Sequence, residues 1–149
     1  MIVSLKEQLM EDLKTAMKLK QTIRKNTVQM VRASVLQVEK DKKIELDDEG
    51  VLEVIAKELK KRRDALPEFE KSGREDLING LKQEIEVLLP YLPEQLSDDE
   101  LKQIVKAAIN ESGAESKRDM GKVMAIVMPQ VKGRADGKRI NMIASEFLA

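Results

Sequence analysis

Apolar side chains recur three and four positions apart along most of this chain, a spacing that predicts amphipathic helices. No segment shows the alternation of apolar and polar residues that a half-buried strand would need. We therefore predict an all-α fold of seven helices. The expected helix starts lie at or just after Ser4, Gln21, Asp47, Arg74, Ser97, Ser116 and Asp136.

The segment 90–93, with the sequence Pro-Tyr-Leu-Pro, is the clearest break in this pattern. Proline ends helices, and two prolines so close together favour extended backbone. We place a proline-marked linker here, between a four-helix domain over residues 1–92 and a three-helix domain over residues 93–149. Pro67, inside the third predicted helix, is expected to kink or interrupt that helix.

Three packing expectations follow from the helical wheels. Ile23 and Met30 belong to the broad apolar stripe of the second helix, and Arg24 within that stripe should snorkel or pair with an acid. Arg62 is expected among the charged residues that decorate the third helix. Gly121 costs about 1 kcal/mol relative to Ala in a helix interior, so we expect it to mark close packing against a neighbour.

The composition removes several classes of enzyme. The chain has no Cys and no His, which excludes Cys nucleophiles, Ser–His triads, disulfides and the usual zinc sites. One Tyr and two Phe are the only aromatic residues, so stacking on nucleic-acid bases would be limited. The acidic run Asp47–Glu49 lacks the spacing of a calcium loop and is interpreted as a helix start. We expect no cofactor and no metal, and we assign no catalytic residue.

The chain also lacks the marks of export and of membrane insertion. Its first seven residues turn charged at once and contain no apolar core of signal-peptide length. No window approaches the roughly 20 apolar residues of a membrane span. These observations favour a cytoplasmic protein without a membrane partner.

Charge is balanced overall, with 27 basic and 27 acidic residues, but it is unevenly distributed. Residues 13–38 include six basic residues and no acid, and residues 117–139 include seven basic residues and two acids. Two basic segments on a neutral protein could suit a polyanion such as RNA. They could equally be solvated helix faces or partners for acids elsewhere in the chain.

The most specific pattern lies in the loop between the sixth and seventh predicted helices. Gly133 is expected to take a left-handed conformation that ends the sixth helix. The free N–H groups that open the seventh helix would then form an anion site. Four basic side chains would surround it: Lys132, Arg134, Lys138 and Arg139. The alternative is an ordinary helix–loop–helix with a glycine stop and Asp136 as the cap.

Two resemblances extend this interpretation. The segments Met120–Met124 and Lys132–Asp136, together with Asn141, resemble the tail of GatB, a subunit of the glutamyl/aspartyl-tRNA amidotransferase. That resemblance covers residues 94–149. The whole chain, including Tyr91–Ser97, resembles the bacterial YqeY family.

In the amidotransferase, the tail is a helical appendage that helps to recognise tRNA, and the chemistry belongs to other parts. The resemblance implies RNA contacts at five positions: Lys122, Lys132, Arg134, Lys138 and Arg139. It also implies that Gly121, Gly133 and Asn141 set the shape of the tail. Asp136 followed by glycine departs from the amidotransferase tail, and a carboxylate there would weaken phosphate binding unless it caps the helix.

These observations lead to three hypotheses. The first is a protein without catalytic machinery of its own that binds tRNA, or a tRNA–enzyme complex, through residues 117–139. The second is a protein-interaction adaptor that uses the charged faces of its N-terminal helices. The third is an enzyme, a carbon–nitrogen ligase with glutamine as the amido donor, or an auxiliary of such a ligase, which is the activity that the family label implies.

Overall fold

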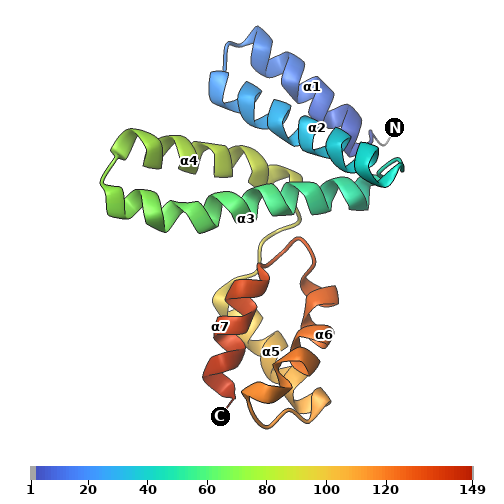
Figure 1. Ribbon diagram of the computed structural model, residues 1–149, viewed down its shortest axis with the longest axis vertical. Helices are drawn as coiled ribbons and strands as arrows, with labels where there is room; N and C mark the ends of the chain where they lie inside the picture. Colours follow the sequence, from blue (N-terminus) through green and yellow to red (C-terminus); the bar gives the residue numbers. More distant parts are fainter. Residues whose placement is uncertain (1–2, 149) are drawn as a thin grey trace. The chain divides into compact units, whose positions relative to one another are not determined.

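The computed structural model describes residues 3–148 and confirms the all-α fold. Met1, Ile2 and Ala149 lie outside the described residues, as does the start of the segment that argued against a signal peptide. The described residues form seven α-helices and two short 3₁₀ helices, with no strand among them (Figure 1). In chain order these are α1 Leu5–Lys18, α2 Thr22–Lys42, α3 Asp48–Ser72, α4 Glu75–Leu88, η1 Leu89–Tyr91, α5 Asp98–Ser112, η2 Lys117–Asp119, α6 Met120–Val131 and α7 Gly137–Phe147.

The chain divides into two compact units, Met1–Leu92 and Pro93–Ala149. In the first unit, α1 and α2 form one helical hairpin, α3 and α4 form another, and α2 packs on both helices of the second hairpin (Figure 1). In the second unit, α5, α6 and α7 pack pairwise around a core of their own.

Two prolines do not break the helical structure where the sequence suggested a break. Pro67 was expected to kink or interrupt the third helix; it lies inside α3, which continues to Ser72, so the helix is not interrupted there. A long helix packed on α2 and α4 can tolerate one missing backbone hydrogen bond, because tertiary contacts hold the flanking turns. Pro90 lies in the 3₁₀ turn η1, and extended backbone begins only at Leu92, with φ −94° and ψ 157°.

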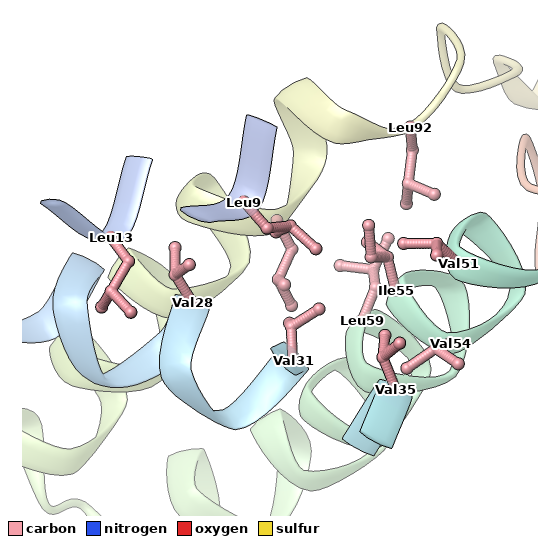
Figure 2. Close-up of a cluster of buried hydrophobic side chains, with 11 residues drawn as sticks. Leu9, Leu13, Val28, Val31, Val35, Val51, Val54, Ile55, Leu59 and Leu92 are labelled. Carbon is pink, nitrogen blue, oxygen red and sulfur yellow. The ribbon is translucent and has the colours of Figure 1, made fainter. Parts of the chain in front are cut away.

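Aliphatic side chains from all four helices of the first unit meet in one core (Figure 2). Removal of this apolar surface from water is the main favourable contribution to folding. The buried members are Leu9, Leu13, Val28, Val31, Val35, Val51, Val54, Ile55, Leu59, Leu88 and Leu92.

The apolar stripe of α2 is narrower than predicted. Val31 and Val35 are buried, but Ile23 and Met30 are 37% and 47% exposed. A helical wheel groups residues by direction from the helix axis. It does not show which edge of a broad stripe the neighbouring helices cover.

The largest departure from the sequence interpretation is a buried ion pair on α3. Arg62, predicted among the charged residues that decorate the third helix, is 6% exposed, and Glu58, one turn earlier, is 4% exposed. Arg62 Nη1 donates to Glu58 Oε2 at 2.8 Å and to the Glu58 carbonyl at 2.9 Å. Ser34 on α2 donates to Glu58 at 3.1 Å, and Glu84 on α4 lies 3.5 Å from Arg62 Nη2. The pair therefore connects three helices.

The environment keeps Glu58 charged. Burial by itself raises the pKa of Glu58, but hydrogen bonds from Arg62 and Ser34, with the charge of Lys61, outweigh it and lower the pKa. The guanidinium N–H donors of Arg62 are less completely hydrogen-bonded. Its Nη2 meets the weakly accepting sulfur of Met30 at 3.0 Å, and its buried Nε has no acceptor among the described residues. Removal of Glu58 would leave this cation buried without its main counter-charge.

A second polar network joins η1 to α1. The Tyr91 hydroxyl donates to Asp12 Oδ2, Gln8 donates to Asp12 Oδ1 at 3.0 Å, and Arg24 Nη2 lies 3.4 Å from the same oxygen. The predicted pairing of Arg24 with an acid is therefore confirmed. Burial, together with Asp12, raises the pKa of Tyr91, so its hydroxyl stays protonated and donates. These four side chains help to line a hollow of about 960 Å³.

The core of the second unit is aliphatic throughout its described residues. It contains Leu96, Leu101, Val105, Ala108, Val123, Val127, Val131, Ile140, Ile143, Ala144 and Leu148. Its first helix opens with a reciprocal capping box. Ser97 Oγ accepts from the Glu100 N–H at 3.2 Å, and Glu100 Oε2 accepts from the Ser97 N–H at 3.0 Å.

Candidate nucleic-acid interface

The loop between α6 and α7 starts with a left-handed turn. Gly133 has φ +75°, a conformation that strains any residue with a Cβ. The backbone N–H groups of Arg134 and Ala135 donate to the Val131 carbonyl at 2.7 and 3.2 Å. Gly133 thus takes the conformation expected from its place after the helix, and it turns the chain towards α7.

This loop is fastened to the segment that precedes α5. Gln95 Nε2 donates to the Gly133 carbonyl at 2.7 Å, and the Leu96 N–H donates to the Arg134 carbonyl at 3.0 Å. Arg134 Nε donates to the Glu94 carbonyl at 3.2 Å. Each such bond contributes about 1 kcal/mol net, so together they favour one loop shape. Arg134 therefore has a structural role in addition to its charge.

Asp136 caps α7. Its Oδ1 accepts from the Lys138 N–H at 2.8 Å, which satisfies one of the free donors at the helix start. The carboxylate also brings negative charge to the place where a phosphate would sit. The helix terminus alone is therefore a poorer anion site than the sequence suggests, and attraction for a phosphate must come from the basic side chains.

Arg139, in the first turn of α7, pairs with Asp98 at the start of α5. Its Nη2 lies 2.6 Å and its Nε 2.8 Å from Asp98 Oδ1. The Asp98 side chain is 71% exposed, and an exposed pair contributes only about 0–1 kcal/mol. Arg139 can therefore exchange Asp98 for another anion at little cost.

Two lysines flank the same loop. Lys132 follows the last residue of α6, and Lys138 lies in the first turn of α7; both are exposed. Within residues 3–148, the Lys138 ammonium makes no hydrogen bond or ion pair. The structure thus brings four candidates to one loop: Lys132, Arg134, Lys138 and Arg139.

Lys122 is not part of this group. It lies in the first turn of α6, about 15 Å along the helix axis from Lys132 at 1.5 Å per residue. It lies 3.6 Å from Asp119, which also accepts from the Glu115 N–H at 3.0 Å. That backbone hydrogen bond, together with Lys122, outweighs burial and lowers the pKa of Asp119. Lys122 and the loop cannot hold the same phosphate.

The remaining motif residues do not act as predicted from the sequence. Gly121 is exposed, and a Cβ at this position would meet no neighbouring atom within 4 Å, so the predicted close packing is wrong. Its place in the first turn of α6 turns it away from the core, which Val123 reaches instead. Asn141 is exposed on α7, and no contact in the structure explains a role in setting the shape of the tail.

The residues that hydrogen-bond to the loop and to the start of α7 were not predicted from the sequence. Neither Gln95 nor Asp98 was singled out from the sequence as a partner for this loop. No spacing rule connects these residues to a loop about 40 positions later. The one signal in the sequence was that Gln95 belongs to the segment 91–97 that carries the family resemblance.

Two further properties concern the described part of the chain as a whole. Between residues 3 and 148, no group of three or more Asp, Glu, His or Cys residues could hold a metal ion. No helix in that range has both the length and the apolar character required to cross a membrane.

The chain matches the model of the YqeY family, described as Yqey-like protein, over residues 6–148. It belongs to this family.

Curated relatives carry the name "Altered inheritance of mitochondria protein 41, mitochondrial". The protein from Pyrenophora tritici-repentis is 33% identical over 130 residues, which cover 86% of this chain and 71% of the relative. The protein from Kluyveromyces lactis is 40% identical over 84 residues, 56% of this chain and 45% of the relative. The protein from Candida glabrata is 35% identical over 89 residues, 58% of this chain and 48% of the relative. The matched region thus spans less than half of the last two relatives.

The prediction of a cytoplasmic location conflicts with these relatives and is corrected. These three relatives and the protein from Lachancea thermotolerans are named as mitochondrial proteins. The prediction rested on the charged first seven residues and on the lack of an apolar window long enough to span a membrane. Neither feature distinguishes the cytoplasm from the interior of an organelle.

Proposed function

We propose that the protein binds structured RNA, such as a tRNA, without catalytic machinery of its own. The contact surface is the α6–α7 loop with its four basic residues. The observation that carries this proposal is the presence of the exposed Lys132 and Lys138 on either side of a loop held in one shape by hydrogen bonds. Because the loop backbone is already held in one shape, little backbone entropy is lost when the two lysines meet a phosphate backbone.

The resemblance to the GatB tail supports RNA as the polyanion, because that tail helps to recognise tRNA. Arg139 would join the contact by exchanging Asp98 for a phosphate. Few aromatic residues are available to stack on bases, so recognition would depend on the backbone and shape of the RNA.

The test is binding of the full-length protein to total tRNA at low and near-physiological salt, with a DNA duplex of equal charge as competitor. Lys132→Ala/Lys138→Ala is the informative variant, since neither side chain contributes to the core. Loss of two phosphate contacts should weaken binding and lower the slope of log affinity against log salt by about 2. Lys40→Ala/Lys42→Ala, exposed residues on α2, is the charge-matched control.

Binding that survives the DNA competitor and weakens only in the loop variant supports the proposal. An equal loss of tRNA affinity in the loop variant and the control variant, or full displacement by DNA, would mean that the binding is non-specific charge attraction. No binding to tRNA at either salt concentration would overturn it and direct the search towards protein partners or an amidotransferase complex.

A further inference from the structure

The turn between α1 and α2 exposes aliphatic side chains that the core does not use. Met17 and Leu19 are 57% and 58% exposed, and Ile23 in the first turn of α2 is 37% exposed. Lys20 completes the turn with φ +58°, and its N–H donates to the Met17 carbonyl at 3.3 Å. We call residues 14–25 the α1–α2 tip. It is the hairpin end farther from the N-terminus (Figure 1).

Basic side chains accompany these apolar ones. Lys14, Lys18 and Lys20 are exposed, and Lys25 is partly exposed. Lys14 lies 3.9 Å from Glu11, but both side chains are about two-thirds exposed, so the attraction is weak. Within residues 3–148, no hydrogen bond or ion pair engages the ammonium groups of Lys18, Lys20 and Lys25.

We propose that the α1–α2 tip is a peripheral contact site for a membrane surface that carries anionic lipids. Apolar side chains flanked by lysines suit the boundary between acyl chains and headgroups. Met17 and Leu19 would enter that boundary, and the lysine stems would lie beside them with their ammonium groups at the headgroup phosphates. The whole protein is neutral, so attraction to such a surface depends on this local excess of positive charge.

The composition of the tip favours a membrane over two other anionic partners. RNA surfaces favour Arg and aromatic side chains, but the one arginine of the tip, Arg24, is paired with Asp12. Protein interfaces are depleted in Lys and enriched in Tyr, Trp and Arg at their centres. Exposed aliphatic residues among lysines match neither pattern.

This inference differs from the sequence-based expectation of no membrane partner. That expectation considered only segments long enough to span a bilayer. A tip that lies at the surface needs a few apolar side chains and several cations, and it needs no spanning helix. The proposal also stands apart from the RNA-binding proposal, because it uses the first unit of the chain and different lysines.

The test is flotation of the full-length protein with vesicles of phosphatidylcholine, with and without phosphatidylserine. We expect co-flotation only with the anionic vesicles, and less of it as salt increases. Lys18→Ala/Lys25→Ala should lower the partition coefficient about 25-fold, from about fivefold per lysine. Met17→Ser/Leu19→Ser should also lower it, but should leave its dependence on salt unchanged.

Matched control variants distinguish binding through the α1–α2 tip from non-specific adsorption to the vesicles. Leu36→Ser removes a side chain that is 61% exposed on α2, and Lys40→Ala/Lys42→Ala removes two lysines beyond it. Both control variants should co-float with anionic vesicles to the same extent as the original protein.

No enrichment on anionic vesicles, equal enrichment on neutral ones, or equal loss in the control variants would each overturn the proposal. Weaker tRNA binding in the tip variants, with unchanged flotation, would assign the surface to RNA instead. Circular dichroism would establish that each variant remains helical.

Discussion

The two units of this chain belong to the same fold class but distribute their charges in different ways. In the first unit, the buried polar and charged residues Thr27, Glu58 and Arg62 lie among aliphatic side chains. In the second unit, no buried polar or charged residue occurs among those described, and the ion pair between Arg139 and Asp98 lies at the surface. Helix packing in the first unit therefore depends on the state of a buried ion pair, whereas the described core of the second unit contains no ionisable group.

Arg62→Ala should produce the largest difference between the units. It leaves Glu58 buried without its main partner, which costs about 3–5 kcal/mol of unfolding free energy. Amide hydrogen exchange, read separately for residues 3–92 and 93–148, should show loss of protection only in the first unit. Lys57→Ala, at an exposed position on the same helix, is the control and should change little. Equal loss of protection in both units would refute the comparison.

Acid should weaken the first unit through its buried carboxylate, Glu58. The folded-state pKa of Glu58 lies below its usual value of 4.5, so the ionised carboxylate stabilises the fold above that pH. This contribution is lost as the pH falls through the lower folded-state pKa. Thermal unfolding followed from neutral to acidic pH should show this loss. Glu58→Gln should lower stability at neutral pH and flatten its dependence on acid; an unchanged profile would contradict the assignment.

Gly133→Ala should destabilise only the second unit. An L-residue in the left-handed region costs about 1–2 kcal/mol, and the loop that fastens to Gln95 would be strained. Gly121→Ala is the matched control, since it is exposed in a helical turn and gains up to about 1 kcal/mol of helix propensity. Chemical denaturation of the two variants should give shifts of opposite sign. Shifts of the same sign would contradict the left-handed conformation assigned to Gly133.

Arg139→Ala should have the smallest effect. The pair with Asp98 is exposed, so its loss should cost no more than about 1 kcal/mol, and high salt should remove the difference from the original protein. Lys138→Ala serves as the control without an ion pair. A cost well above that limit, or one that persists in concentrated salt, would mean that Arg139 supports the core.

The local features of the candidate site followed from nearby residues. Gly133 as a helix stop and Asp136 as a cap each depend on a few neighbouring positions, and their roles can be recognised from residue type and spacing. The pairing of Arg134 with the Glu94 carbonyl, and of Arg139 with Asp98, could not be predicted in this way. These contacts join positions about 40 residues apart, and no local pattern encodes them.

The sequence by itself determined the all-α class, the main helices and most of the aliphatic core, because helical periodicity and capping act over a few residues. Tertiary structure alone decided which edge of each amphipathic stripe is covered. It exposed Ile23 and Met30, buried Glu58 with Arg62, and paired Arg139 with Asp98. The physical reason is that burial depends on which helices meet, whereas a helical wheel reports only the direction in which a side chain leaves its own helix.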